Sequence, residues 1–336
     1  MNIGKVPENI LKRQVFKHTG AKRPEVYVGA GVGEDCAAIE LDKDELVILS
    51  TDPVTGTTKD IGRWAVIVSA NDIASSGAEV VGILVSSLLP PDTDEEALKV
   101  IMTELSDTCE ELNIQIVGGH TEITDAVKNP LLTVTGVGKV KKDRFLGTGG
   151  GQIGDDLVVT KWVGLEGTSI IAKEKEDLLS ERFSKAFIDK AKAFSEYLPV
   201  LAEAKAATQS NSAKVHAMHD ITEGGVFGAL WEMAESAGCG LSVDLKKIPI
   251  KQETVEICNS FDINPYELMS SGSMIMAVKD GESLVKELEE KGIHAAVIGS
   301  LNEGNDRVVI NGEEKRFLTP PPADELYKAL HKENLV

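Results

Sequence analysis

Residues 29–72 read GAGVGEDCAAIELDKDELVILSTDPVTGTTKDIGRWAVIVSAND and place acidic residues at the edges of apolar segments. Asp35 follows a glycine-rich turn, Asp52 follows an apolar strand-like segment, and Asp72 lies at the end of a second apolar run. Taken singly, each acid is more typical of a turn or a helix cap, so the prediction rests on the set. Three converging carboxylates repel one another, and a divalent cation is their natural partner. Because Mg²⁺ is commonly bound by one or two carboxylates together with nucleotide phosphates, the stretch predicts a Mg-nucleotide site.

The composition excludes several classes of partner. The chain has 336 residues, 42% of them hydrophobic and 26% charged, which is ordinary for a globular protein and long enough for two domains. A formal charge of −19 argues against binding to nucleic acid or to an anionic membrane, but not against ATP, whose charge Mg²⁺ offsets. We find no signal peptide and no apolar run near the roughly 20 residues of a membrane helix, so we expect a cytoplasmic protein. The four cysteines are far apart, without metal-binding spacing, and are expected to be free thiols: Cys36, Cys109, Cys239 and Cys258.

A glycine-rich segment at 147–154 is the best candidate for a domain boundary, because five of its eight residues are glycine. We therefore predict domains over 1–150 and 151–336. The first reads as a sheet with helices on one side, and the second as a further α/β unit. The apolar patterns predict helices over 5–19, 60–77, 168–206, 284–291 and 323–333, a helix capped by Thr93 or Asp94, and strands over 46–49, 80–89, 114–117, 131–140, 156–160, 215–220, 241–245 and 295–298.

Five short blocks in order along the chain carry a family resemblance. They are Gly33-Glu-Asp-Cys-Ala-Ala38, Ser50-Thr-Asp52, Ala70-Asn-Asp-Ile-Ala-Ser-Ser-Gly-Ala78, Gly118-Gly-His-Thr121 and Asp220-Ile-Thr-Glu-Gly-Gly225, with Ser270-Ser-Gly272 as a later element. Together they resemble the superfamily of aminoimidazole ribonucleotide synthetase, selenophosphate synthetase, thiamine-monophosphate kinase and the hydrogenase-maturation dehydratase HypE. The residues of the second and third blocks are most similar to those of the dehydratase branch.

The resemblance implies an α+β protein with the two-domain PurM-like fold. Its N-terminal domain would form a homodimer through its sheet and bind Mg-ATP, and its C-terminal domain would be a mixed α/β domain that closes over the site. Asp35, Asp52 and Asp72 are carried over as metal ligands, while Asn71 would orient Asp72 or touch a phosphate. Two glycines of the first block, Gly31 and Gly33, would let backbone N–H groups approach phosphate, although a plain tight turn explains them equally well.

Residues 118–122 depart from the family pattern. The resemblance places Gly118 and Gly119 at the nucleotide, but His120 stands where most branches have an acid. A neutral imidazole is still able to bind metal or phosphate, and Glu122 would supply the missing charge. A structural histidine at the end of a strand is the alternative.

In the second half, Asp220 and Glu223 stand where relatives contact substrate or a second metal, and we predict catalytic roles for them alongside His120. Asp220 ends a predicted strand before a glycine-started helix, so that an N-cap is the alternative. The dehydratase branch works through a cysteine at its extreme C-terminus, and this sequence ends in residues 331–336 without one. The synthesis of a cyanide ligand by that route would have no carrier in the chain.

Three functions remain open on the sequence. The first is an ATP- and Mg-dependent enzyme, similar to the dehydratase branch, that activates a small acceptor by phosphoryl transfer. The second is a small-molecule kinase of the thiamine-phosphate type. The third is a nucleotide-binding protein without turnover that docks as a partner in a maturation or biosynthetic complex.

Overall fold

The computed structural model describes residues 12, 24–29, 31, 33–34, 36–42, 44–54, 60–319 and 323–335. By its internal contacts the chain divides into two compact units. The larger holds the described residues of Met1–Ala21, Ala30–Glu34 and Leu146–Val336, and the smaller those of Lys22–Gly29 and Asp35–Phe145. The predicted helix over 5–19 lies outside the described residues except for residue 12.

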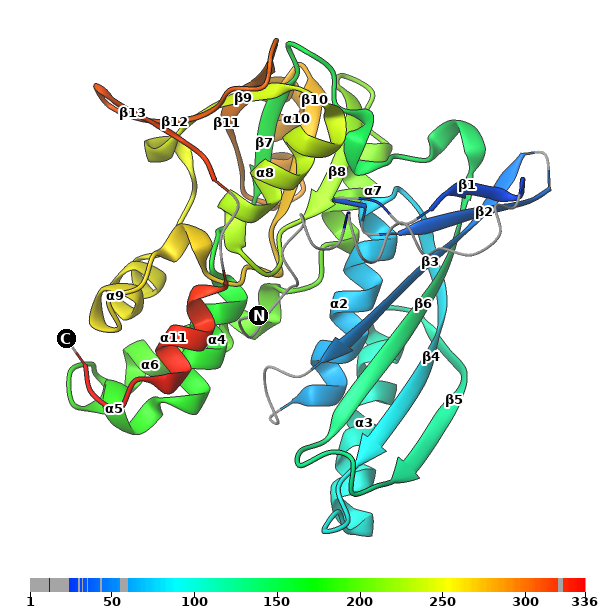
Figure 1. Ribbon diagram of the computed structural model, residues 1–336, viewed down its shortest axis with the longest axis vertical. Helices are drawn as coiled ribbons and strands as arrows, with labels where there is room; N and C mark the ends of the chain where they lie inside the picture. The colour runs from blue at the N-terminus through cyan, green and yellow to red at the C-terminus, as the bar shows by residue number, and fades with distance from the viewer. Residues whose placement is uncertain are drawn as a thin grey trace. The chain divides into compact units, whose positions relative to one another are not determined.

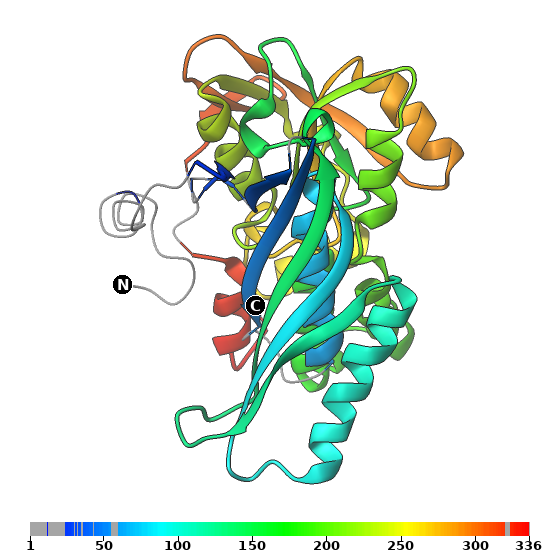
Figure 2. The ribbon, with the colours of Figure 1, turned by 90° about the vertical axis from the view of Figure 1, so that its right-hand side faces the viewer.

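The smaller unit is a six-stranded sheet with helices on one face (Figure 1). The strand order is β1-β2-β3-β6-β4-β5, with β4 and β5 parallel and the other neighbours antiparallel. Figure 2 shows the opposite, helix-free face of this sheet turned toward the viewer. Its elements are β1 (Val26–Val28), β2 (Ala37–Asp42), β3 (Glu45–Val54), α2 (Ile61–Ser75), β4 (Glu79–Leu89), α3 (Glu95–Glu111), β5 (Gln115–Ile123) and β6 (Leu131–Lys141).

Helix α2 lies directly on the sheet because β6 presents glycines to it. A Cβ atom on Gly138 would lie 2.3 Å from Cγ2 of Ile73, and one on Gly136 would lie 2.6 Å from Oγ of Ser69. Both distances are far below ordinary contact, so any side chain at these positions would displace the helix. The alternation of apolar and small residues over 131–140 therefore specifies a close helix–sheet layer. Helix α2 covers Ile61–Ser75 and so ends close to the end of the helix predicted over 60–77.

The larger unit contains a seven-stranded sheet in the order β13-β12-β9-β11-β7-β10-β8. Neighbouring strands are antiparallel except β12 and β9, which run parallel. The main core lies between this sheet and α8, with Leu230, Met233 and Ile275 among its fully buried side chains. The strands are β7 (Asp156–Thr160), β8 (Lys214–Asp220), β9 (Gly240–Asp244), β10 (Met274–Lys279), β11 (Ala295–Asn302), β12 (Arg307–Asn311) and β13 (Glu314–Phe317).

A second group of helices in this unit packs around α4, away from the strands (Figure 1). It consists of α4, α5, α6, α9 and α11, whereas α7 and α10 lie with the sheet. The helices are α4 (Leu165–Glu174), α5 (Glu176–Ser180), α6 (Lys185–Lys192), α7 (Leu201–Thr208), α8 (Gly225–Ala237), α9 (Gln252–Ser260), α10 (Gly281–Glu290) and α11 (Glu325–His331).

Most predicted elements are present at or near their expected positions. The helical region predicted over 168–206 is divided among α4, α5, α6 and α7, and one strand differs. Strand β5 continues through Gly118 and Gly119 to Ile123, whereas the sequence predicted that it would end at Val117. Gly119 is required here because β5 approaches β4 so closely that a Cβ would lie 2.0 Å from the carbonyl oxygen of Val85. Within the described part of the chain, every helix is too short or too polar to cross a membrane.

Candidate functional site

Two predicted metal ligands lie together in the smaller unit. Ser50 and Asp52 are two residues apart on β3, so their side chains project from the same face of the sheet, the face that α2 covers. Asp72 comes from α2 and is 7% exposed. Oγ of Ser50 lies 3.0 Å from Oδ2 of Asp52 and also contacts Oδ2 of Asp72. The sheet and the helix therefore bring two carboxylates to one hydroxyl group.

This arrangement gathers oxygen donors of one kind at a single point. A hydroxyl carries one proton and can donate it fully to one acceptor, so at the other contact two oxygen atoms face each other. A divalent cation bound between the oxygens would relieve that repulsion. Carboxylate and hydroxyl oxygens are hard donors of the kind that Mg²⁺ prefers, and the donor set fits this ion.

The main chain around Asp72 is held firmly. Its carbonyl oxygen accepts hydrogen bonds from Sγ of Cys36, at 3.1 Å, and from Oγ of Ser75, at 2.7 Å. Asn71, predicted to orient Asp72 or to touch phosphate, is fully buried. These contacts fix the last turn of α2, so the position of the Asp72 carboxylate is set by the fold of this unit.

The third predicted acid cannot be placed, because Asp35 lies outside the described residues. Among the residues that are described, no group of three or more histidine, cysteine, aspartate or glutamate side chains is arranged to hold a metal ion. The structure brings Asp52 and Asp72 together, and the metal-binding roles of Asp35, Asp52 and Asp72 stay predictions.

The glycine-rich turn belongs by its contacts to the larger unit. Gly33 has a φ of +69°, and a Cβ there would lie 2.9 Å from the carbonyl oxygen of Glu232 on α8. Oγ of Ser236, on the same helix, donates a hydrogen bond of 3.2 Å to Glu34. Gly33 is therefore required by the close contact with α8. The predicted approach of Gly31 and Gly33 to a phosphate stays a prediction.

His120 and Glu122 form a separate group within the smaller unit. Both side chains are exposed on the edge strand β5, where Nε2 of His120 lies 3.3 Å from Oε2 of Glu122. The register pairs Asp52 with Val134, Val134 with Val85, and Val85 with Gly119. Three strand spacings, about 14 Å, therefore separate the backbone of Asp52 from that of Gly119. Within one chain, these residues of β5 therefore do not lie next to Asp52. The roles predicted for His120, Glu122, Gly118 and Gly119 stay predictions.

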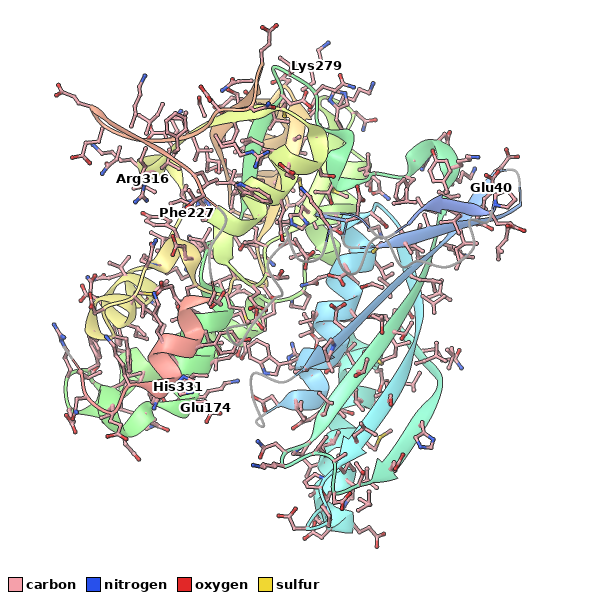
Figure 3. The ribbon with its side chains drawn as sticks, in the orientation of Figure 1. Glu40, Glu174, Phe227, Lys279, Arg316 and His331 are labelled. Carbon is pink, nitrogen blue, oxygen red and sulfur yellow. The ribbon has the colours of Figure 1, made fainter. Side chains whose placement is uncertain are left out.

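The predicted catalytic acids of the second half lie where β8 enters a loop. Asp220 ends β8 and is 1% exposed, and Glu223 lies in the loop that leads into α8. His219, one residue earlier, pairs with Glu232 of α8 at 3.0 Å. Just inside α8, the ring of Phe227 stacks on Tyr266 at 5.4 Å between ring centroids and lies under the guanidinium group of Arg316 (Figure 3). These contacts fix the helix that follows the loop.

Two buried carboxyl groups near this loop were missed by the sequence analysis. Oε2 of Glu166 accepts a hydrogen bond of 3.1 Å from the backbone N–H of Ser271. Burial raises the pKa of Glu166 to about 7, against the hydrogen bonds of Ser271, and the charge of Glu223 raises it further. Burial likewise raises the pKa of Asp324 to about 7, against three backbone hydrogen bonds. The position of Asp324 at the start of a predicted helix was a signal for a cap, but nothing in the sequence distinguished Glu166 from a surface residue.

Two family profiles match the chain, and they cover most of it. Residues 33–140 match the N-terminal domain of the AIR synthase related proteins, and residues 152–311 match the C-terminal domain of the same proteins. The chain belongs to the AIR synthase-related family. The paired acids Asp52 and Asp72 fall within the first match, and the Asp220–Gly225 loop falls within the second.

Relatives of this AIR synthase-related protein include hydrogenase maturation proteins. A putative hydrogenase expression/formation protein of Methanocaldococcus jannaschii is 27% identical over 315 residues, which are 91% of this chain and 91% of the relative. The carbamoyl dehydratase HypE of Rhodobacter capsulatus is 26% identical over 305 residues, covering 88% of this chain and 86% of the relative.

Solved structures agree with the fold predicted from the sequence. HypE in complex with ATP has a TM-score of 0.73 at 18% identity and covers 98% of each chain. A HypE–HypF complex contains a chain with a TM-score of 0.71 at 19% identity, covering 84% of this chain and 93% of that one. The two-domain PurM-like α+β fold is confirmed, and so is the resemblance to the HypE branch.

Proposed function

We propose that this AIR synthase-related protein binds Mg-ATP through Asp52 and Asp72 and activates a small acceptor by phosphoryl transfer. The observation that carries the proposal is the meeting of these two carboxylates at the hydroxyl of Ser50. A bound Mg²⁺ ion would neutralise the carboxylates and the phosphate oxygens of the nucleotide. The solved complex of HypE with ATP, a structure of the same fold, supports a nucleotide as the ligand.

The residues of this chain would act mainly by positioning and by charge. Asp52 is placed by the sheet and Asp72 by the last turn of α2, where the carbonyl oxygen of Asp72 accepts hydrogen bonds from Cys36 and Ser75. Such fixed oxygen ligands cost little reorganisation when the reaction develops charge. Asp220 and Glu223 of the larger unit are proposed to contact the acceptor, since they stand at the end of a strand before a helix start.

The proposal is tested by the binding of Mg-ATP to the full chain, measured by calorimetry. We expect Asp52→Asn and Asp72→Asn each to lower the affinity for Mg-ATP at least tenfold, about 1.4 kcal/mol. The matched control is Asp107→Asn, which removes an exposed carboxylate from α3 in the same unit. Unchanged affinity in both variants, with the control also unchanged, would show that the nucleotide is bound elsewhere.

The class of reaction is tested by the products. Release of ADP or AMP that depends on an added acceptor would support phosphoryl transfer, and a hydroxyl or phosphomonoester acceptor would favour the alternative of a thiamine-phosphate type kinase. Tight binding of Mg-ATP with no cleavage in the presence of any acceptor would favour the non-catalytic partner protein. The HypE–HypF complex supports the idea of a protein partner in a maturation complex.

We further propose that a second copy of the chain covers the helix-free face of the smaller unit, which Figure 2 shows toward the viewer. Leu84 and Val117 are 41% and 54% exposed on neighbouring strands. On the same face, the hydroxyl groups of Thr51 and Thr135 pair at 2.9 Å. An apolar sheet face of this kind favours association through the sheet, as the family resemblance predicts.

A further inference from the structure

Asp324 stands immediately before α11 and is 1% exposed. Its carboxylate accepts backbone hydrogen bonds from three separate segments. Oδ1 accepts from the N–H of Leu326 at 2.8 Å and from the N–H of Met269 at 3.1 Å, while Oδ2 accepts from the N–H of Gly224 at 2.7 Å. A helix cap requires the bond to Leu326, but it requires neither of the other two.

The two additional donors belong to loops that pack against each other. The N–H of Ser270 donates to the carbonyl oxygen of Thr222 at 3.2 Å. Gly225 has a φ of +63°, and a Cβ on it would lie 2.6 Å from the carbonyl oxygen of Tyr266. The loop of residues 220–225, which carries Asp220 and Glu223, is therefore seated on residues 266–270, and Asp324 bonds to both sides of that contact.

We propose that Asp324 is a positioning residue that fastens the 220–225 loop to the 268–273 loop and so sets where Asp220 and Glu223 lie. The chemistry of the group supports this role, because an ionised carboxylate offers lone pairs on two oxygens and can accept all three N–H bonds. A serine offers one oxygen that can reach the helix amide. An asparagine replaces one accepting oxygen by an N–H₂ donor, which would face a backbone N–H.

The set of hydrogen bonds that Asp324 accepts from the two loops, which we call the clamp, depends on the negative charge of the carboxylate. Burial raises the pKa of Asp324 to about 7, and the charge of Glu223 on the clamped loop raises it further. The other titratable groups around it are Tyr327 on α11 and Cys258 on α9, whose pKa values are raised mainly by burial and further by nearby charges that include that of Asp324. Two more carboxyl groups contribute: the charge of Glu166 on α4 raises the pKa of Tyr327 further, and the charge of Glu325 on α11 raises the pKa of Cys258 further. Protonation below pH 7 turns one oxygen into a donor, so the clamp loosens as the pH falls.

Hydrogen exchange of the full chain, followed by mass spectrometry, tests the clamp without any substrate. We expect Asp324→Ser and Asp324→Asn to speed exchange of the amides in 222–226 and 268–271 at least tenfold. In the serine variant, the amides of α11 should remain within threefold of the native rate, because serine still caps the helix. The matched control is Asp280→Ser, since Asp280 caps α10 of the same unit through Ser283. Native exchange of both loops in the two Asp324 variants would overturn the proposal.

The functional consequence rests on the proposed function and is measured separately. Asp324→Ser should lower kcat for ATP turnover at least tenfold, while the Kd for Mg-ATP stays within twofold, because Asp52 and Asp72 belong to the other unit. Because the clamp loosens as the pH falls, we expect kcat of the native chain to rise as the pH increases through 7. This rise should be absent from Asp324→Ser. Faster loop exchange without any ATP turnover in the native chain would uphold the clamp and refute the proposed function. Faster loop exchange with native kcat and a native pH profile would show that the clamp does not position the site.

Discussion

The carboxylates of Asp52 and Asp72 meet at one hydroxyl group, Oγ of Ser50, although they come from a strand and from the helix that covers it. The contact places two like charges close together in a partly buried environment. A divalent cation bound between the two carboxylates would offset this repulsion, as the proposed function requires.

The first prediction is that Mg²⁺ alone stabilises the protein. At a concentration of 100 times its Kd, a ligand that binds only the folded state adds about 2.7 kcal/mol to the free energy of unfolding. We expect the melting temperature to rise with added MgCl₂, and the rise to disappear in Asp52→Asn and in Asp72→Asn. Differential scanning calorimetry in matched concentrations of NaCl and MgCl₂ measures this. An equal rise in the native chain and both variants would mean that these carboxylates are not the binding site.

Local patterns predicted the fold and the pairing of elements better than they predicted contacts between distant residues. The apolar run before Asp72 and the stop at Gly77 were sufficient to predict α2, and Asp94 caps α3 as one of two expected residues. The predicted end of β5 was wrong, because two consecutive glycines, considered without their tertiary contacts, indicate a turn. Gly119 is required instead by the approach of β5 to Val85, which is distant in the sequence.

The same limit applies to the candidate site. The sequence singled out Asp52 and Asp72, but it could not indicate that Ser50 would join them, because this depends on how α2 lies on β3. His120 and Glu122 are close to each other, as a strand spacing of two predicts, but the strand order puts three spacings between β5 and β3. Asp324 was predicted to be near a helix start, but its bonds to Gly224 and Met269 are tertiary contacts.

The second prediction concerns the close packing of α2 on β6. Gly138→Ala would place a methyl group 2.3 Å from Cγ2 of Ile73 and 2.9 Å from the carbonyl oxygen of Glu79. Overpacking of this kind costs about 1–3 kcal/mol, and we expect a loss of that size in the free energy of unfolding measured in urea. Because Ile73 adjoins Asp72, the affinity for Mg²⁺ should fall as well.

A matched control for this prediction is Gly118→Ala, where the nearest atom to the added Cβ would lie 3.8 Å away. Its stability should stay within about 0.5 kcal/mol of the native value, as is usual for surface changes. Equal stability of the two variants would show that α2 lies further from the sheet than described.

The third prediction concerns the helix-free face of the smaller unit. Leu84→Lys adds a charge to an exposed apolar position on β4 in that face, and a buried unpaired charge strongly opposes association. We expect sedimentation equilibrium to show a dimer for the native chain and a Kd of dissociation at least a hundredfold higher for the variant. The control, Val100→Lys, changes a residue of α3 that is 49% exposed and should leave the dimer intact. A native chain that is monomeric at high concentration would contradict the prediction.

The fourth prediction follows from Glu166. Its pKa is raised to about 7 in the folded protein by burial, compared with 4.5 for an ordinary glutamate. Between these two values the folded state binds a proton that the unfolded state has already lost, so this group lowers the stability as the pH rises from about 4.5 to 7. Glu166→Gln keeps an oxygen that can accept from the N–H of Ser271 and carries no charge, and therefore removes this loss.

We accordingly expect Glu166→Gln to gain stability over the native chain as the pH increases, by about 1–3 kcal/mol at pH 8 and by much less at pH 5. Urea unfolding at both pH values measures the difference. Glu174→Gln, an exposed position on the same helix (Figure 3), is the control and should change the stability little at either pH. If the free energy of unfolding of Glu166→Gln changed with pH as that of the native chain does, Glu166 would already be ionised in the folded protein. In that case burial and the charge of Glu223 would not be the forces that set the pKa of Glu166.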